Sequence, residues 1–413
     1  MKTAVIIGGG ASGFMAAITL AQQYKNNDLK IIILERMDRV GKKLLATGNG
    51  TCNITNSDCS AERYHGDTAA AQTVIEKFTP QMATSFFASI GVVCTKKEDG
   101  RIYPYSRQAS SVLDCLRSKA TGLNIEERCK SEVVGIKKAG KGFLLSINDN
   151  STVRADVVIV AFGGKTAPSL GGASSGYELM RQLGHNVTKL SPALVQLKTD
   201  TAKIRALKGV KTDAEISLVQ DGKVINRQFG ELLFTEYGIS GPPVLQLSRP
   251  VGVQKGRFLV NIDFMPDYDK KELEKLLFTR RNHLSKVTLE NFFTGMLNKR
   301  IGQAVIKTSL EKPLSALCNE LSDNELIILA KSIKNFQLSV NGTLSWQNAQ
   351  VTAGGVPAKE FDLSCMQSKL CKGLFAAGEL INVDGDCGGF NLQWAWSSGH
   401  IAGCGAAAYL KNI

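Results

Sequence analysis

A glycine-rich turn near the start of the chain has the spacing with which nucleotide-binding proteins hold a pyrophosphate. The pattern is G-x-G-x-x-G, directly after the apolar run Val5-Ile6-Ile7. Its first glycine allows a tight turn, its second lets the backbone approach phosphates, and its third lets the following helix pack closely on the strand. The N–H groups at the start of that helix would bind the anion. The residues assigned to this site are Gly8, Gly10, Ala11, Ser12 and Gly13. The alternative is a plain glycine turn before a helix.

A second apolar run favours the nucleotide interpretation. Residues 30–34 read Lys-Ile-Ile-Ile-Leu and are followed by Glu35 and Arg36. The acid lies about 20 residues beyond the glycines, where a ribose-binding carboxylate is expected. Strand, helix to about Tyr24, second strand and acid are therefore all in place. We assign Glu35 and Arg36 to the cofactor site.

The segment 41–56 is rich in Gly, Asn and Thr and lacks periodicity, so we expect a long loop. Long loops in compact domains are usually functional or disordered. This one could wrap a phosphate, a ribityl chain or a ring edge. The candidate contacts are Lys42, Lys43, Thr47, Gly48, Asn49 and Asn53. Cys52 is a candidate proton donor, or else a buried inert thiol.

Two later strand ends carry further candidates. Residues 156–161 form an apolar strand that runs into Phe162-Gly163-Gly164-Lys165, and residues 374–379 form a strand that reaches a Gly-acid corner before a glycine-rich helix start. An acid at such a corner can hold a ribityl hydroxyl, and the helix start can face negative charge on a reduced flavin ring. The candidates are Ala161, Gly163, Gly164, Gly378, Glu379, Asp384, Gly389, Asn391 and Gln393. No second G-x-G-x-x-G follows, so we expect one nucleotide-binding domain and, for any NADPH or NADH, transient docking.

The elements around these motifs predict an α/β protein in which a small β domain is inserted into a Rossmann-like domain. We expect helices over 69–91 and from about Ala109 to Lys119, and a turn over 100–106. Short alternating segments around 131–138, 142–148 and 152–160 predict a small antiparallel ribbon followed by a return strand. Residues 193–264 alternate as in a small barrel or sandwich, with a hairpin at Asp221-Gly222. Residues 268–334 are helical in period, with caps at Asp269 and Asp323.

This pattern gives five segments. They are 1–191 and 351–413 for the cofactor domain, 192–267 and 335–350 for the inserted β-barrel, and 268–334 for a helical insertion within that barrel.

The composition describes a soluble globular protein with an excess of positive charge. The 413 residues are 43% hydrophobic and 21% charged, and the net charge is +13. The ten cysteines include no C-x-x-C pair and no metal-ligand spacing, so we expect free thiols and no metal. No run is long enough for a membrane span and no signal peptide is evident, so we expect a cytoplasmic protein. The charge fits a polyanionic partner such as RNA, or only a solvated basic surface.

Taken together, these motifs resemble the BaiN/RdsA (YhiN-like) family of NAD(P)/FAD-dependent oxidoreductases, a branch of the two-dinucleotide-binding-domain flavoproteins. The matching segments are 5–13, 41–56, 100–106, 160–165 with Gly176, 232–246 and 351–403. The resemblance implies extended FAD, with the adenosine over Gly8–Gly13 and Glu35. Its isoalloxazine would lie between segments 41–56 and 384–393.

The sequence departs from the family pattern in two places. Thr51 stands before Cys52 where the family more often has Arg, and Glu236 follows Thr235 where the family usually has His. Both changes could alter substrate or proton handling.

The resemblance implies hydride transfer from reduced FAD to a C=C bond, most specifically of uracil in ribosomal RNA, which gives dihydrouridine. The alternatives are an NAD(P)H/FAD-dependent reductase or oxidase of a small metabolite, and a flavin-holding RNA-binding factor without turnover. The candidate proton donors are Cys52, Tyr237 and Glu236, with Cys387 a further possibility; His400 is expected to pack or cap. Nothing in the sequence indicates an oligomeric state.

Overall fold

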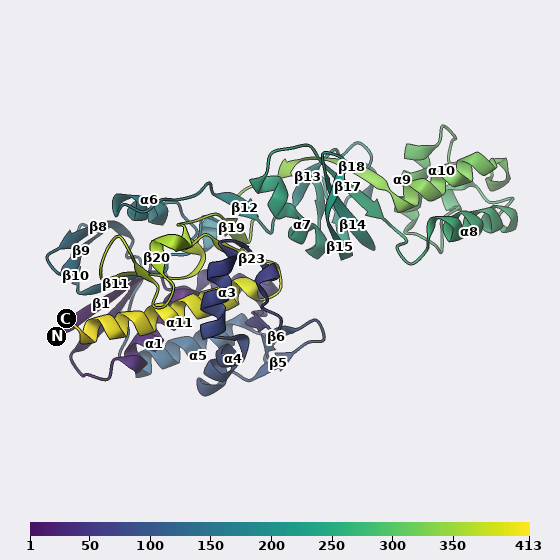
Figure 1. Cartoon of the computed structure of the whole chain (residues 1–413). Helices are drawn as coiled ribbons and strands as arrows, with labels where there is room; N and C mark the ends of the chain where they lie inside the picture. Colours follow the sequence, from purple (N-terminus) through teal and green to yellow (C-terminus); the bar gives the residue numbers. More distant parts are fainter. The chain divides into compact units, whose positions relative to one another are not determined.

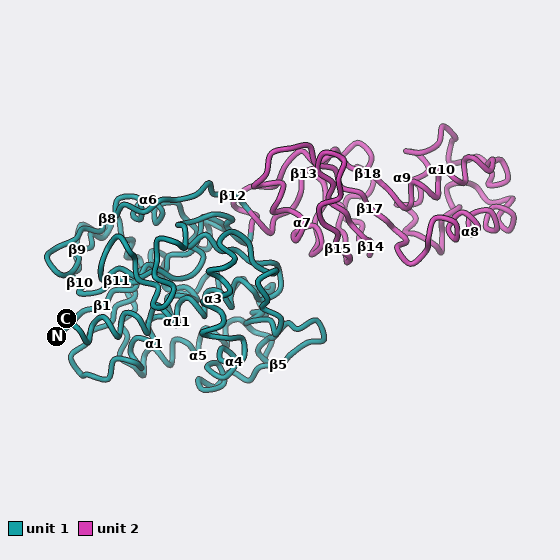
Figure 2. Tube along the Cα trace, in the orientation of Figure 1, with its two compact units in different colours: residues 1–192, 350–413 teal, residues 193–349 magenta.

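The computed structural model describes all 413 residues and divides into two compact units. Unit 1 comprises Met1–Pro192 and Gln350–Ile413, and unit 2 comprises Ala193–Ala349 (Figure 2). Unit 2 is thus an insertion in unit 1. We describe each unit by itself.

A seven-stranded sheet organises unit 1 (Figure 1). Its order is β20-β21-β22-β11-β1-β2-β7, and the five strands from β22 to β7 run parallel. Its strands are β1 Lys2–Ile7, β2 Leu29–Leu34, β7 Glu126–Arg128, β11 Val157–Val160, β20 Phe361–Asp362, β21 Gln367–Ser368 and β22 Leu374–Ala376. All four residues of β11 are buried, as expected where helices cover both faces of a parallel sheet.

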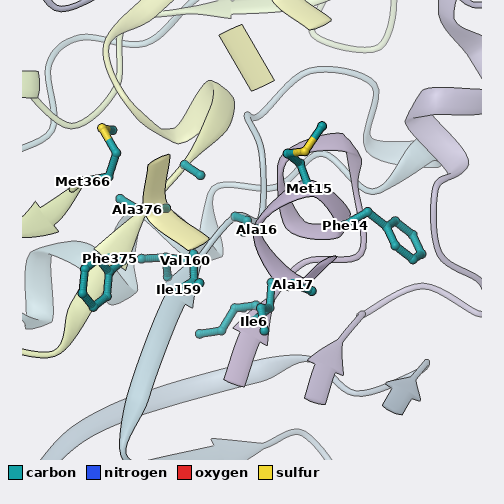
Figure 3. Packing of buried hydrophobic residues seen from close by; sticks show 14 of the residues in the cluster. Ile6, Phe14, Met15, Ala16, Ala17, Ile159, Val160, Met366, Phe375 and Ala376 are labelled. Atoms are coloured by element: carbon teal, nitrogen blue, oxygen red, sulfur yellow. The ribbon is translucent and has the colours of Figure 1, made fainter. Parts of the chain in front are cut away.

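Two helices from opposite ends of the chain pack together next to this sheet. Helix α1, Ala11–Gln23, follows β1, and helix α11, Phe390–Lys411, closes the chain. A Cβ atom placed on Gly399 or Gly403 would lie 2.6 Å from the carbonyl oxygens of Ser12 and Ala16, respectively. The two glycines therefore let α11 lie directly against α1, beside the apolar cluster shown in Figure 3.

Smaller sheets and helices complete unit 1. The strands β8, β9 and β10 form an antiparallel meander, β3-β6-β5 form a second sheet, and β23 pairs with β4. The remaining elements are α2 Lys42–Ala46, β3 Thr55–Asn56, β4 Tyr64–Gly66, α3 Thr68–Lys77, α4 Pro80–Ser89, β5 Cys94–Lys96, β6 Arg101–Pro104, α5 Ala109–Gly122, β8 Val133–Ala139, β9 Gly142–Ile147, β10 Thr152–Ala155, α6 Ser175–Gln182, β12 Ser191–Ala193, β19 Val351–Ala353 and β23 Val383–Gly385.

Three local predictions in unit 1 are wrong. The helix expected over 69–91 is two helices, because Pro80 starts α4 and the Thr79 side chain caps it by accepting from Met82 N. The turn expected over 100–106 contains strand β6, which pairs with both β3 and β5. The loop expected over 41–56 contains helix α2 and a 3₁₀ turn at Thr47–Gly50.

Unit 2 is a closed six-stranded barrel with order β13-β16-β15-β14-β17-β18. Its elements are β13 Leu197–Thr199, β14 Lys211–Gln220, β15 Lys223–Phe234, β16 Gly238–Ser240, α7 Pro242–Val253, β17 Phe258–Asp263 and β18 Phe336–Thr343. The predicted hairpin at Asp221-Gly222 is confirmed: Gln220 pairs with Lys223, and both turn residues have positive φ.

Three helices lie in the chain between β17 and β18. They are α8 Lys270–His283, α9 Lys299–Ser309 and α10 Asp323–Lys334. Asp269 caps α8 in a capping box with Glu272, as predicted. The cap of α10 is Ser322 rather than Asp323, because the serine hydroxyl accepts from Glu325 N. The predicted fold class, a Rossmann-like domain with an inserted barrel, is confirmed.

None of the helices combines the length and the apolar character that crossing a bilayer requires.

We predict that Phe87→Ala destabilises unit 1 by about 3–5 kcal/mol, since it leaves a large cavity. Phe87 is fully buried, and its ring meets Trp396 of α11 edge-on with centroids 5.1 Å apart. Phe86→Ala is the matched control, because Phe86 is only half-buried and should cost less. Chemical unfolding followed by Trp fluorescence measures both; equal losses would contradict the packing role.

Candidate functional site

The glycine turn after β1 is shaped by contacts that leave no room for side chains. A Cβ atom on Gly13 would lie 1.9 Å from the carbonyl oxygen of Gly8, and one on Gly8 would lie 2.5 Å from the carbonyl oxygen of Ala161. Gly8 also has φ +108°, which favours glycine. A Cβ atom on Gly10, in contrast, would have no neighbour within 4 Å. Gly8 and Gly13 are therefore needed for packing, whereas Gly10 borders open space.

Helix α1 begins at this open space without a side-chain cap. Gly10 is the N-cap residue, and the first amide bonded back into the helix is that of Phe14, which donates to Gly10 O. The amides of Ala11, Ser12 and Gly13 thus precede the first intrahelical bond. Uncapped amides at the positive end of a 13-residue helix are suited to bind an anion.

Glu35 lies at the end of β2, next to the turn. One carboxylate oxygen accepts from Gly9 N at 2.9 Å and the other from Met37 N at 2.8 Å. A carboxylate has further lone pairs, so Glu35 can still accept from a hydroxyl. Arg36 points elsewhere, with Nη1 3.7 Å from a Glu132 oxygen.

The segment 41–56 brings only some of its candidate side chains toward other site segments. Lys42 pairs with Asp38, and the Thr47 hydroxyl donates to Leu44 O within the same turn. Gly48 and Asn49 both have positive φ, which forms the tight turn ahead of Cys52. Of the candidates in this segment, Lys43 and Asn53 lie next to residues that are distant in the sequence, namely Glu379 and Gly389.

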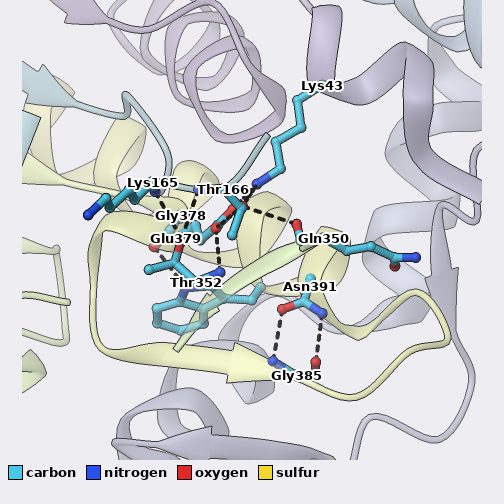
Figure 4. A network of polar contacts seen from close by, with 10 residues as sticks. Lys43, Lys165, Thr166, Gln350, Thr352, Gly378, Glu379, Gly385 and Asn391 are labelled. Atoms are coloured by element: carbon cyan, nitrogen blue, oxygen red, sulfur yellow. Dashed lines mark hydrogen bonds and ion pairs between the residues drawn. The ribbon is translucent and has the colours of Figure 1, made fainter. Parts of the chain in front are cut away.

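A polar network joins Lys43 to Glu379 (Figure 4). Lys43 Nζ donates to Glu379 Oε2 at 2.6 Å and to the Thr166 hydroxyl at 3.0 Å. Glu379 Oε1 accepts from Thr352 N at 2.8 Å, and the Thr352 hydroxyl accepts from Lys165 N at 2.9 Å. The network ties together α2, the segment after β11, β19 and the corner after β22.

The glycines that follow β11 and β22 differ in how much space surrounds their Cβ positions. A Cβ atom on Gly164 would lie 2.1 Å from Glu379 Oε1, and one on Gly378 would lie 2.5 Å from the Ser12 hydroxyl oxygen. Gly163 has φ +80° and no atom near its Cβ position. The corner after β22 therefore lies against the start of α1, where the amides are free.

Asn53 faces the start of the C-terminal helix. Its Oδ1 is buried and has no hydrogen-bond partner, and a Cβ atom on Gly389 would lie 3.0 Å from that oxygen. Gly389 is the N-cap residue of α11, with φ +98° and no side-chain cap. Asn391 closes the preceding turn, since its side chain bonds both N and O of Gly385. The buried Asn53 oxygen thus lies next to the uncapped amides at the start of α11.

Gln393 and Asp384 lie inside the protein. Gln393 is fully buried; its Nε2 donates to Phe78 O and its Oε1 accepts from the Thr55 hydroxyl. Both polar atoms of this side chain therefore already have partners within the chain. Asp384 is buried on β23, opposite His65 of β4.

The Cys52 thiol is fully buried, and desolvation raises its pKa to about 12. The thiol therefore stays neutral at physiological pH, which fits the alternative of a packed, inert cysteine. All ten cysteines are free. His400 packs as expected, with its ring stacked on Phe78 at 4.3 Å.

Glu236 and Tyr237 lie in unit 2, between β15 and β16. Lys208 Nζ lies 2.5 Å from Glu236 Oε2, and this hydrogen bond lowers the pKa of the exposed Glu236 carboxyl. Glu236 is thus a carboxylate at neutral pH and holds no proton to give. The half-buried Tyr237 phenol has no partner within the chain.

Sequence reasoning did not single out Thr166, Thr352 and Tyr177. The two threonines complete the network around Glu379, and the Tyr177 hydroxyl is buried without a hydrogen-bond partner. Thr352 lies in a segment of the family resemblance, and Thr166 and Tyr177 directly follow one, but isolated side chains of these types have no spacing signal. Only the fold brings positions 166 and 352 together.

These features fit a bound dinucleotide. The open space at Gly10 and the free amides of α1 suit a pyrophosphate, and Glu35 suits a ribose hydroxyl. The unpartnered Asn53 Oδ1 beside Gly389 can accept a hydrogen bond from an N–H of a ring system. No three His, Cys, Asp or Glu side chains gather as they would around a metal ion.

Comparison with known proteins agrees with this geometry. A family model described as HI0933-like protein Rossmann domain matches residues 2–405. The chain is 39% identical, over 97% of its length and 98% of the relative's, to the 3-dehydro-bile acid delta(4,6)-reductase of Clostridium scindens. It is 30% identical to the ribosomal RNA dihydrouridine synthase of Escherichia coli, over 96% of this chain and 95% of that protein.

The fold has a counterpart among solved structures. The crystal structure of 3-ketosteroid delta1-dehydrogenase from Sterolibacterium denitrificans superposes with a TM-score of 0.52 and 12% identity, over 99% of this chain and 100% of the other. At this identity the likeness concerns the fold alone. Since the family model spans nearly the whole chain, the chain belongs to the HI0933-like family that its sequence resembles, and it is an FAD-dependent oxidoreductase.

Proposed function

We propose that this protein is an NAD(P)H-driven reductase of a carbon–carbon double bond in a small organic molecule. The observation that carries the proposal is the 39% identity, over nearly the full length of both chains, to an enzyme named a delta(4,6)-reductase. FAD supplies the hydride chemistry, and the protein supplies position and electrostatics.

The proposal assigns the chain's own residues as follows. The amides of α1 and the open space at Gly10 hold the pyrophosphate, and Glu35 holds the adenosine ribose. Asn53 and the amides at the start of α11 bind polar ring edges. The Lys43–Glu379 pair fixes the walls between these two regions and keeps a cation beside them.

Reduction of uracil in ribosomal RNA is the second candidate. The Escherichia coli and Haemophilus influenzae relatives named ribosomal RNA dihydrouridine synthases favour it, as does the net charge of +13. Three basic residues that an RNA partner could use, however, have partners inside the chain. Lys42 pairs with Asp38, Arg281 pairs with Asp323, and the Arg280 guanidinium donates to the carbonyl oxygens of Phe292 and Thr294. Binding a phosphate would require breaking these contacts, so we rank the small substrate first.

Gly10→Leu should abolish FAD retention without unfolding the protein. Gly10 has φ −90° and no neighbour at its Cβ position, so a leucine fits the apoprotein but fills the space that we assign to the pyrophosphate. We expect FAD affinity to fall by more than about tenfold, because phosphate contacts at a helix N-terminus need close backbone approach. Flavin absorbance per protein measures this. Gly122→Leu, at an exposed glycine that also lacks neighbours, is the control; equal FAD loss in both would refute the assignment.

Among the candidate proton donors we expect only Tyr237 to matter. Tyr237→Phe should lower turnover by about 10²-fold, the usual size of a lost general acid, with FAD content unchanged. Glu236→Gln and Cys52→Ala should stay near wild type, because the first group is an ion-paired carboxylate and the second a buried neutral thiol. Steady-state turnover of the FAD-loaded variants measures these effects. A large loss in Glu236→Gln with Tyr237→Phe active would contradict this choice.

The two candidate functions differ in what makes the protein consume NADPH or NADH. We expect oxidation of the nicotinamide to require a small ketone conjugated to a C=C bond, with a product two hydrogens heavier by mass spectrometry. The second candidate function is tested by measuring dihydrouridine in ribosomal RNA from cells with and without the gene. Dihydrouridine that disappears with the gene and returns with the wild-type copy would instead establish the RNA reaction.

A further inference from the structure

Unit 1 has a surface cavity of about 480 Å³, widely open to solvent, that the function proposed above does not use. Cationic and apolar side chains line it together, among them Lys137, Lys138, Lys372, Leu183, Leu370 and Cys371. Its volume lies within the range of about 300–1,000 Å³ that is typical of small-molecule sites.

The cavity lies at the opposite edge of the central sheet from the glycine turn. Residues 370–372 come immediately before β22, whereas Gly8 comes immediately after β1. Both β22 and β1 run parallel to β11, which lies between them. The N-terminal end of β22 and the C-terminal end of β1 therefore lie at opposite ends of the parallel strands. The remaining walls come from β8 and from the end of α6, which Figure 1 shows on the same side of the unit. A ligand here would not compete with the cofactor.

A buried network holds one wall of the cavity in place. The Ser368 hydroxyl accepts from Leu370 N and Cys371 N, at 3.1 Å and 2.9 Å. Its oxygen also lies 2.9 Å from His185 Nε2, while His185 Nδ1 lies 2.7 Å from Glu360 Oε2. Ser368, His185 and Glu360 are connected as in the catalytic triad of a hydrolase. The two backbone amides, however, occupy both lone pairs of the serine oxygen, so this oxygen is not available as a nucleophile. The network therefore anchors the turn.

A second contact joins this wall to the opposite one. Lys138 Nζ donates to the carbonyl oxygen of Lys372 at 2.5 Å and lies 4.1 Å from the centre of the Phe143 ring. The turn at 370–372 is thus fixed to β8 and β9 as well as to the interior. The cavity is preformed, which spares a ligand the cost of ordering it.

The charges around the cavity are unbalanced. Neither Lys137 nor Lys372 has an acidic partner, and Lys138 is bound to a carbonyl group rather than to a carboxylate. Leu370 is 55% exposed at the rim and so offers aliphatic surface there. Unpaired ammonium groups next to exposed aliphatic surface complement a ligand that is anionic at one end and apolar at the other.

We propose that this cavity is a second binding site that takes a small amphipathic anion, namely a carboxylate carried on an aliphatic body. The carboxylate lies between Lys137 and Lys372, and the aliphatic part covers Leu183 and Leu370. The site is separate from the one that holds FAD, so both are filled in the same molecule.

Titration calorimetry of FAD-loaded protein with monomeric decanoate tests the proposal. We expect one saturable site whose Kd rises with added NaCl, because exposed ion pairs are screened by salt. The Lys137→Glu/Lys372→Glu double variant should raise Kd by about tenfold, the combined size of two exposed ion pairs. The control is Lys96→Glu/Lys97→Glu, which changes the charge of the same unit equally at exposed lysines away from the cavity. Equal weakening in both, or no saturable binding, would overturn the proposal.

Cys371 gives a readout at the site itself. Burial raises the pKa of its thiol, so alkylation is followed by peptide mass spectrometry at alkaline pH. Decanoate should slow alkylation of Cys371 and leave the half-buried Cys115, on α5, unchanged. Sedimentation with phosphatidylglycerol vesicles separates the free anion from a membrane surface. Vesicle binding without decanoate binding or Cys371 protection would refute the small-ligand site.

Discussion

The close approach of backbone to backbone around the start of α1 is the constraint on which unit 1 depends. Gly13 lies so near Gly8 that no side chain fits between the helix and the strand end. Gly399 and Gly403 apply the same condition to α11, whose backbone lies against that of α1. Van der Waals contact between bare backbones lets the last 64 residues complete a sheet begun by the first 192. Larger side chains at these glycines would separate the two halves of the cofactor domain.

The same arrangement leaves helix ends without partners where a ligand can reach them. Both α1 and α11 start at a glycine that offers no side-chain cap. Four other helices have a side-chain cap, at Thr79, Asp269, Asn298 and Ser322, whereas α2, α3, α5, α6 and α7 also lack one. The uncapped ends therefore cost stability in the empty protein and regain it when an anion or a polar ring edge binds.

Several charged residues in this protein hold segments together. Glu379 binds Lys43, a threonine hydroxyl and a backbone amide in one network. Arg280 and Arg281 close the helical insertion through carbonyl groups and Asp323, instead of presenting free cations. The net charge of +13 therefore does not show which cations are free to contact a polyanion. This distinction is why the full-length likeness to a small-molecule reductase weighs more here than the charge does.

The sequence by itself determined the local features that depend on neighbouring residues. Four such features are predicted from a few adjacent residues, and the structure contains all of them. They are the glycine turn, the two parallel strands connected by α1, the Asp221-Gly222 hairpin and the Asp269 cap. The alternation of apolar and polar residues over 193–264 also predicted a small barrel or sandwich, because alternation is a local pattern.

Only the tertiary structure decided which candidate side chains face a ligand. Gln393 and Asn53 both carry a side-chain amide in a glycine-rich segment, yet the fold gives Gln393 internal partners for both polar atoms and leaves the Asn53 oxygen with none. Glu236 looked like an acid until Lys208, 28 residues away in the chain, was found against it. Thr166 and Thr352 meet across 186 residues. Contacts between distant segments depend on how the whole chain packs, and a sequence pattern a few residues long carries no information about them.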